Sequence, residues 1–152
     1  MMETIDPAKA ARVWQRVQGG SSRDPEELIP LATYEQGDAS TYLQLSRRFQ
    51  GKDAAVLRQL YEQELSHASC LKGMYQMLTG NHLPIPATQP ILGENTQAAL
   101  RRCYAREMQS LAAYEARMND PEYGQVFSRL AQQERTHCHT LLTIIGNLKK
   151  GK

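Results

Sequence analysis

The residues of this chain that could do chemistry stand in two copies of one pattern, Glu-x-x-His. Glu64 and His67 form the first copy, and Glu134 and His137 form the second copy in the later half of the chain. Residues three apart share one face of a helix, so the Glu and the His of each pair could bind one metal ion. Carboxylate together with imidazole suits iron or manganese, and the lack of thiolate argues against a structural zinc site. One copy alone is more often a solvated helix face, whereas two copies in register favour a metal site.

Both pairs interrupt seams of apolar residues that recur with helical spacing. Every position of the first seam reappears in the second seam at one constant offset, the offset that separates Glu64 from Glu134. Such a stripe faces the core of a helical protein, so the Glu and His within it are expected to be buried. The apolar members are Leu57, Leu60, Leu71, Met74 and Leu78 in the first seam, and Phe127, Leu130, Leu141, Ile144 and Leu148 in the second.

A second repeated pattern has one Glu and, two helical turns later, one Tyr. Glu35 and Tyr42 lie on one seam, and Glu107 and Tyr114 lie on another with the same spacing. The chain therefore reads as a duplicated helical hairpin. The four Glu stand at matching depths in their helices, so four carboxylates and two imidazoles are expected to meet at the middle of a bundle.

Burying these carboxylates without counter-charge would be expensive, because they repel one another and lose their hydration. Four Glu and two His suffice for two metal ions bridged by carboxylates, and we predict two iron ions, with manganese as the alternative. Tyr42 and Tyr114 are read either as plain core aromatics or as hydrogen-bond donors to ligand carboxylates. The predicted metal ligands are Glu35, Glu64, His67, Glu107, Glu134 and His137.

Four long helices are needed to position these residues, and clusters of glycine and proline mark where the helices end. No segment alternates with the period of a strand, so the predicted fold class is all-α. A short helix around residues 8–18 is expected before the four long ones. The long helices are expected at residues 24–49, 53–79, 94–119 and 120–147. The predicted division is 1–23 for the short N-terminal helix and linker, 24–148 for the bundle and 149–152 for a tail.

Local signals set the expected helix ends. Asp24 reads as the N-cap of the first helix, with Glu27 closing a capping box. Asp53 is expected to cap the second helix, and Gly80 is expected to stop it. Asp120, followed by a proline, is expected to start the fourth helix.

The connection between the second and third helices, residues 81–93, carries topological information. It holds three prolines among thirteen residues and should be extended. An extended chain of that length spans roughly 45 Å, and a helix of about 26 residues is about 39 Å long. The connection can therefore run the length of the bundle and start the third helix parallel to the second. This predicts a four-helix bundle with one long crossover between helices 2 and 3.

Charge and composition exclude several classes of function. With 18 basic and 16 acidic side chains the formal net charge is +2, which gives no electrostatic reason to expect nucleic acid or an anionic membrane as a partner. No apolar run approaches the roughly 20 residues that span a bilayer, and the first residues lack the apolar stretch of a secretory signal. Cys70, Cys103 and Cys138 form no C-x-x-C pair, which fits a reducing, cytoplasmic setting.

Over residues 25–148 the chain resembles the rubrerythrin branch of the ferritin-like superfamily. The resemblance implies a ferritin-like four-helix bundle that binds two irons. Members of this family reduce hydrogen peroxide, and some of them oxidise ferrous iron. It also implies that the six predicted residues are the ligands, with Glu64 and Glu134 as the bridges. The segments that carry the resemblance are residues 32–39 with Tyr42, residues 62–68, and residues 122–127 leading to 133–137.

Two departures from the family pattern affect the expected activity. Rubrerythrins usually carry a further Glu one turn from the ligand on helix 3, but the residues three before and three after Glu107 are Tyr104 and Ser110. The full-length peroxidases also append a rubredoxin domain with two C-x-x-C pairs, and no such pair occurs here. We therefore expect electrons from a separate redox protein if the chain reduces peroxide or dioxygen.

Two alternatives stay open from the sequence. The first is a non-catalytic protein that binds or stores iron or manganese, with ferrous iron as its cargo. The second is a structural bundle whose site is empty. A symmetric homodimer is the expected assembly, and assembly into a hollow shell would instead support storage.

Overall fold

Two helical hairpins and the long connection between them make up the described part of the chain. The computed structural model describes residues 24–86 and 92–150, and these residues contain helices and turns but no strand, which confirms the all-α prediction. The short helix expected at residues 8–18 lies outside the described residues, and the division into three segments stays a prediction. The elements are the 3-10 helix η1 (Pro25–Glu27) and the α-helices α2 (Leu28–Ser46), α3 (Gly51–Thr79), α4 (Thr96–Glu115) and α5 (Gly124–Lys150).

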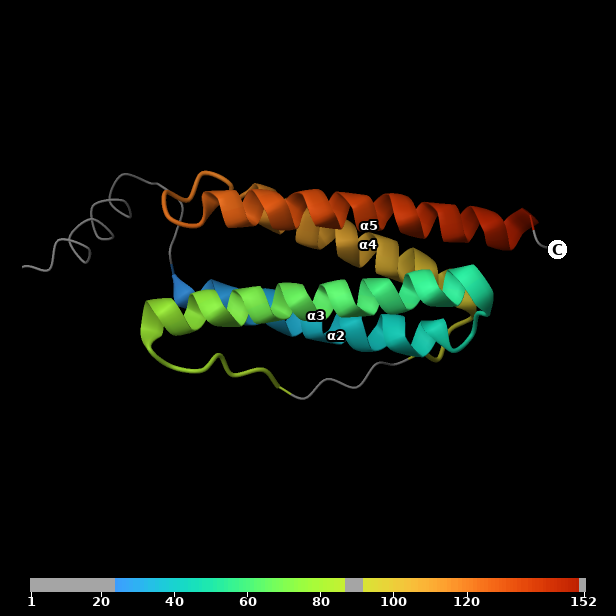
Figure 1. Cartoon of the computed structure of the whole chain (residues 1–152), viewed down its shortest axis with the longest axis horizontal. Helices are drawn as coiled ribbons and strands as arrows, with labels where there is room; N and C mark the ends of the chain where they lie inside the picture. Colours follow the sequence, from blue (N-terminus) through green and yellow to red (C-terminus); the bar gives the residue numbers. More distant parts are fainter. Residues whose placement is uncertain (1–23, 87–91, 151–152) are drawn as a thin grey trace, which may run out of the picture.

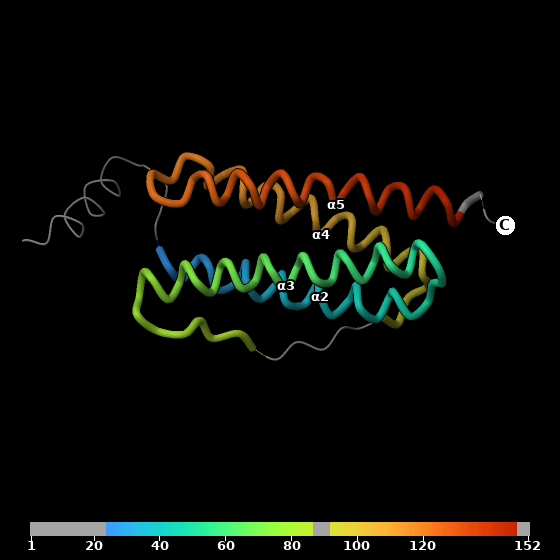
Figure 2. Tube along the Cα trace, in the orientation of Figure 1, coloured from blue at the N-terminus to red at the C-terminus, as the bar shows by residue number. Residues whose placement is uncertain are grey.

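The helices form a bundle with one crossover, as predicted (Figure 1). Helices α2 and α3 run antiparallel and pack closely along their length, and so do α4 and α5. The connection leaves α3 at one end of the bundle and reaches α4 at the opposite end, so α3 and α4 run in the same direction (Figure 2). This topology brings the two halves of the duplicated sequence face to face.

The first helix starts differently from the prediction. Asp24 does act as an N-cap, but its Oδ1 accepts from the backbone N–H of Glu26 at 3.0 Å, and the first turn is the 3-10 helix η1. The Glu27 carboxylate accepts from Nη2 of Arg117, in the other hairpin, at 3.0 Å, and the Glu27 N–H binds the Asp24 backbone oxygen at 3.1 Å. The contact of the Glu27 side chain with Asp24 in a capping box stays a prediction. The chain becomes α-helical at Leu28 and stays so to Ser46, three residues short of the predicted end. Pro30 fits in the first turn of α2, where its missing N–H has no helical partner to lose.

The ends of α3 follow the glycines. Gly51, with a φ of +63°, is already the first helical residue, and Gln50 is the N-cap in extended geometry. The prediction of Asp53 as the N-cap is therefore wrong. This residue lies in the first turn, where the helix dipole stabilises its negative charge. Gly80 ends the helix as predicted, in the left-handed conformation with a φ of 76° and its N–H bonded to the Gln76 carbonyl at 2.7 Å.

The second hairpin has a longer turn than predicted. Asn95 caps α4 by accepting from the N–H of Ala98 at 2.8 Å, and α4 ends at Glu115, four residues early. The predicted start of the fourth helix at Asp120 is wrong, because its Oδ1 binds the N–H groups of the next turn and α5 begins at Gly124. Glycine is required there, since a Cβ would clash with the backbone oxygen of Met118.

The crossover is anchored where it reaches the second hairpin. Arg48, just after α2, donates from Nη2 to the Leu92 carbonyl at 2.8 Å and from Nη1 to the Glu94 carbonyl at 3.2 Å. Near the other end of the crossover, Leu83 is buried against the bundle. These contacts fix where α4 begins relative to the first hairpin.

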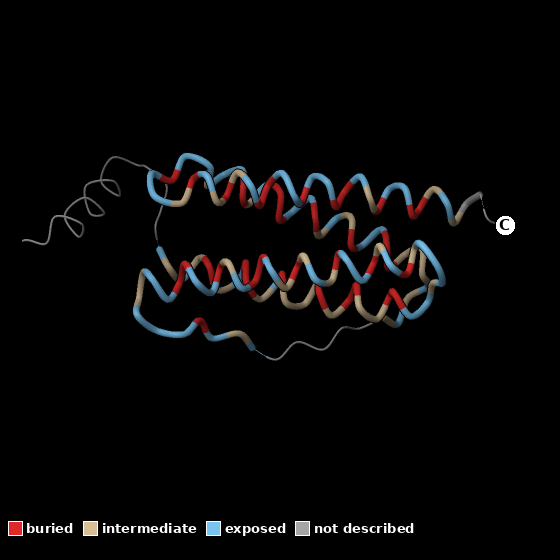
Figure 3. The backbone as a smooth tube through the Cα atoms, in the orientation of Figure 1, coloured by how far each residue is buried: buried red, intermediate tan, exposed pale blue. Residues whose placement is uncertain are grey.

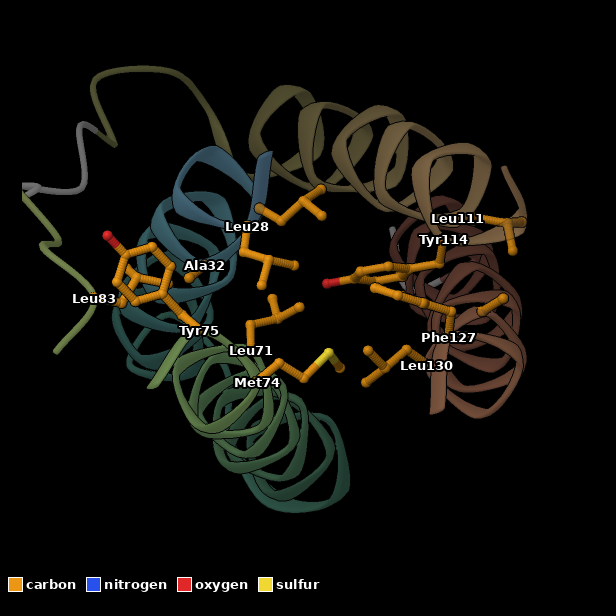
Figure 4. Close-up of a cluster of buried hydrophobic side chains, with 12 residues drawn as sticks. Leu28, Ala32, Leu71, Met74, Tyr75, Leu83, Leu111, Tyr114, Phe127 and Leu130 are labelled. Carbon is orange, nitrogen blue, oxygen red and sulfur yellow. The ribbon is translucent and has the colours of Figure 1, made fainter. Parts of the chain in front are cut away.

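The buried residues of all four helices face the inside of the bundle (Figure 3). They form two apolar clusters, one around Leu71 and Phe127 and the other around Leu45 and Leu100. Figure 4 shows the first cluster, in which the Tyr114 side chain reaches from α4 toward the first hairpin. No helix in the described ranges is long and apolar enough to cross a membrane.

Candidate metal centre

All six predicted ligands lie in the middle of the bundle, between the two apolar clusters. The four Glu have an exposed fraction of 0%, and the two His have 2% and 1%. Each helix contributes at the depth that the seams predict. The six residues are Glu35 from α2, Glu64 and His67 from α3, Glu107 from α4, and Glu134 and His137 from α5.

The six side chains form two overlapping groups. In each group one oxygen or nitrogen from every member lies within 4.8 Å of those of the others. Glu64 and Glu134 belong to both groups, which is the arrangement that two carboxylate-bridged ions need. The first group is Glu35, Glu64, His67 and Glu134, and the second is Glu64, Glu107, Glu134 and His137.

Each imidazole directs Nδ1 at a carboxylate of the opposite hairpin. The Nδ1 atom of His67 lies 2.7 Å from Oε1 of Glu134 and 3.4 Å from Oε2 of Glu35. The Nδ1 atom of His137 lies 2.7 Å from Oε1 of Glu64 and 3.4 Å from Oε2 of Glu107. The two rings stack with their centroids 5.6 Å apart, so the two halves of the centre are nearly equivalent.

The inward-facing atoms of the cluster are not satisfied by the protein. Despite their short distances, the Nδ1 atoms and the carboxylate oxygens that face them do not have the alignment of hydrogen bonds. Buried atoms of this kind are costly unless they bind something, and carboxylate oxygen with imidazole nitrogen suits iron or manganese. The donor set therefore fits two such ions. The unpartnered atoms include Oε2 of Glu35, Oε2 of Glu107, both oxygens of Glu64 and of Glu134, and Nδ1 of His67 and His137.

The two tyrosines bind the outer oxygens of the terminal carboxylates, that is, of Glu35 and Glu107, each of which belongs to only one of the two groups. Tyr42 donates from its hydroxyl to Oε1 of Glu107 at 2.6 Å, and Tyr114 donates to Oε1 of Glu35 at 2.7 Å. Burial, followed by the charge of the bound Glu, raises the pKa of both tyrosines well above the ordinary value, so both hydroxyls keep the proton they donate. Each terminal carboxylate is thus held by one oxygen while the other oxygen faces the centre.

Two glutamines, for which the sequence predicted no role, contact the outer nitrogens of the two histidines. The Nε2 atom of His67 lies 2.5 Å from Oε1 of Gln133, and the Nε2 atom of His137 lies 2.7 Å from Oε1 of Gln63. An amide oxygen can only accept, so each Nε2 carries the proton and each Nδ1 is free to bind a metal. The sequence shows only that each glutamine directly precedes the Glu of a Glu-x-x-His pair, and this position does not reveal its contact with the His of the other hairpin.

Without metal, the cluster holds protons. Burial, and after it the charge of Glu35, raises the pKa of Glu64 and Glu134 well above the ordinary carboxyl value. Burial opposes ionisation of Glu107 too, but contacts with Glu134 and His137 lower the pKa of Glu107 to about 2. Burial lowers the pKa of His67, but the contacts with Glu35, Gln133 and Glu107 together outweigh burial, so the pKa of His67 is raised overall. Ions entering the centre must therefore displace protons.

The comparison with known protein families agrees with this geometry. The family model described as Rubrerythrin matches residues 32–145 of the chain. The matched range contains all six clustered residues, both tyrosines and both glutamines. No curated protein and no solved structure matches the chain.

Proposed function

The chain belongs to the rubrerythrin family, and on that premise we propose that it is a di-iron oxidoreductase that reduces hydrogen peroxide or dioxygen. The observation that supports the proposal most strongly is the pair of overlapping ligand groups that share Glu64 and Glu134. Two carboxylates common to both groups can bridge two ions and couple them electronically. A mononuclear site would need only one of the groups.

The side chains of the centre have separate tasks in this proposal. The six clustered residues hold the ions, and the bound ferrous pair supplies the two electrons that the oxidant takes up. Gln63 and Gln133 keep each imidazole with Nδ1 inward, and Tyr42 and Tyr114 keep one oxygen of each terminal carboxylate engaged. The apolar clusters on both sides exclude bulk water.

The test is anaerobic reconstitution of the metal-free protein with ferrous iron, followed by one equivalent of hydrogen peroxide. We expect ferrous iron to be oxidised rapidly, with growth of a ferric absorption band and no radical products. The His67→Ala variant serves as the matched control, since it removes one ligand of the first group. Binding of iron without oxidation by peroxide or dioxygen would contradict the redox proposal.

One observation favours a second candidate, a protein that binds or stores iron or manganese without catalysis. The residues one turn from Glu107 are Tyr104 and the buried Ser110, and neither is the further carboxylate that the family usually has there. A centre that lacks this group could take up ferrous iron as cargo rather than turn over peroxide. Assembly into a hollow shell, seen by light scattering, would support storage, whereas a plain dimer would favour the oxidoreductase.

The partners and the compartment are part of the proposal. We expect a separate redox protein to return electrons to the centre, and a symmetric homodimer as the assembly. A cytoplasmic location is supported by Cys70, Cys103 and Cys138, which are all free thiols. Sizing by light scattering and reduction assays with candidate donor proteins test these expectations.

A further inference from the structure

The duplicated halves of the centre differ at one polar position beside the ligands. The offset that relates Glu35 to Glu107 places Ser110 opposite Asp38 in the repeat. The same offset pairs Tyr34 with Arg106, so the carboxylate and its basic neighbour occur once only. The centre is therefore symmetric in its six clustered residues but not in what surrounds them.

Asp38 is poorly satisfied by its protein partner. Its Oδ1 lies 3.4 Å from Nε of Arg106, which is long for a charge-assisted hydrogen bond, and its side chain is only 13% exposed. Its Oδ2 is buried and has no hydrogen-bond partner. An ordinary surface ion pair would leave that oxygen in water, so this carboxylate has one buried acceptor atom that the protein does not satisfy.

The position of Asp38 along the helix assigns it to one half of the centre. It lies on α2 between Glu35 and Tyr42, and Tyr42 reaches across to bind Glu107. Its partner Arg106 is the residue directly before Glu107. Through Arg106, Asp38 thus adjoins the half of the centre that holds Glu107 and His137. It lies outside the two ligand groups, so its side chain would have to turn inward to reach an ion there.

Arg106 has other contacts that could hold it when it leaves Asp38. Its guanidinium lies 3.9 Å from the centroid of the Tyr34 ring, and its Nη1 donates to Oε1 of Gln109. A cation over an aromatic ring is stabilised by the ring even near the surface. Arg106 can thus be displaced from the carboxylate by an ion without losing all of its partners.

We propose that Asp38 is an additional carboxylate ligand for the ion beside Glu107 and His137, so that the two ion positions have unequal affinities. The inference rests on the proposed function only in requiring that two ions bind in the centre. The ion beside Glu107 and His137 gains a further carboxylate contact, and the ion beside Glu35 and His67 has Ser110 in the corresponding place. The position next to Asp38 fills first.

The experiment is a titration of the metal-free, full-length protein with Mn²⁺ under anaerobic conditions, with free Mn²⁺ measured by its electron paramagnetic resonance signal. For the unaltered chain we expect two equivalents to bind in two resolved steps. Asp38→Asn should weaken the tighter step by about 10- to 100-fold, the range for lost supporting groups at metal sites. The matched control is Glu62→Gln, which makes the same carboxylate-to-amide change at an exposed residue of α3 and should leave both steps unchanged.

A second variant separates a ligand from a structural ion pair. Arg106→Gln removes the competitor for Asp38, so the tighter step should become tighter still. If Asp38 served only the fold, both variants would lower the melting temperature of the metal-free protein and leave the two binding steps as they were. Circular dichroism of each metal-free variant checks that the bundle is intact.

The outcomes separate this inference from the proposed function. Two unequal steps, with only the tighter one weakened in Asp38→Asn, support the inference. Wild-type binding constants in Asp38→Asn, or equal weakening of both steps, overturn it while leaving the di-metal proposal in place. Failure of the unaltered chain to bind a second ion overturns both.

Discussion

The two hairpins carry the same chemistry in the same places, and they differ where their local surroundings differ. Helices α2 and α3 offer a Tyr-bound Glu, a Glu common to both ligand groups, a His and a Gln, and helices α4 and α5 offer the same set. Each hairpin supplies hydrogen-bond partners for the Glu and His of the other, because every Tyr–Glu and His–Gln contact joins the two hairpins. Neither hairpin alone would contain the centre, so the fold and the site depend on the same association.

The differences lie outside that set. Asp38 stands opposite Ser110 in the repeat, and Ala54 stands opposite Gly124. The first difference would change the affinity of one ion position, and the second allows the tight turn at the start of α5. The two halves thus share the residues that two ions need, and each residue that differs affects one half only.

The largest expected effect comes from removing an imidazole. His67→Ala and His137→Ala should each lower the metal content from two ions per chain to one or fewer, because each removes the nitrogen ligand of one group and leaves a space in the core. Elemental analysis after reconstitution and gel filtration measures this. Exposed His139 provides the control, since His139→Ala should leave the content unchanged. Unaltered metal content in both ligand variants would instead support the bundle with an empty site.

The next effect in size is stabilisation by the metal itself. At a free metal concentration near a thousand times Kd, binding should stabilise the fold by about 4 kcal/mol, which is a rise in Tm of roughly 8–16 °C for a domain of this size. Differential scanning calorimetry with and without Mn²⁺ measures it. An unchanged Tm at saturating metal counts against a built metal centre.

The same stabilisation should grow with pH. Burial, and after it the charge of Glu35, raises the pKa of Glu64 and Glu134 in the metal-free fold. Their protonated forms stabilise that fold below the unfolded pKa, and this contribution is lost as the pH rises through the folded pKa. Ions meanwhile compete better as protons leave. The metal-induced rise in Tm should therefore be larger at pH 8 than at pH 5.5, and a smaller rise at pH 8 would contradict this account.

A smaller effect tests whether the halves are equivalent. Tyr42→Phe and Tyr114→Phe each leave a buried carboxylate oxygen without its donor, which should cost about 1–3 kcal/mol. Because the two hydrogen bonds are alike in length and burial, the two losses should agree within about 1 kcal/mol. Urea denaturation of the metal-free variants gives both values. A clear difference between the two losses of unfolding free energy would show that the two tyrosines do not stabilise their halves equally.

The smallest effect concerns glycines in the helices. A Cβ at Gly73, inside α3, would meet nothing within 4 Å, so Gly73→Ala should stabilise the protein by about 0.5–1 kcal/mol. Gly124→Ala should destabilise it, because the Met118 backbone oxygen occupies that space. Opposite signs in thermal denaturation are expected, and equal signs would show that the turn before α5 can relax.

The sequence could predict the bundle and the clustered residues because both follow from periodicity. Helical seams interrupted at the same depth in four helices leave little freedom in where Glu35, Glu64, Glu107 and Glu134 can lie. Helix ends were predicted less well. The late start of α5 goes with hydrogen bonds from the backbone N–H groups of Glu122 and Tyr123 to the Asp120 side chain, which residue type alone does not reveal.

The supporting residues needed the structure. Gln63 and Gln133 have the sequence appearance of solvated polar residues, and their contacts with the histidines span 74 and 66 residues. Asp38 is similar, since its partner Arg106 is 68 residues away. Contacts across the hairpins depend on how the helices are turned about their axes, which a pattern of apolar residues fixes only roughly.

The most direct test of the central claim is a crystal structure of the iron-loaded protein with anomalous data at the iron edge. We predict two peaks per chain between Glu64 and Glu134, one beside Nδ1 of His67 and the other beside Nδ1 of His137. A single peak, no peak, or iron bound at the Nε2 atoms would contradict the account.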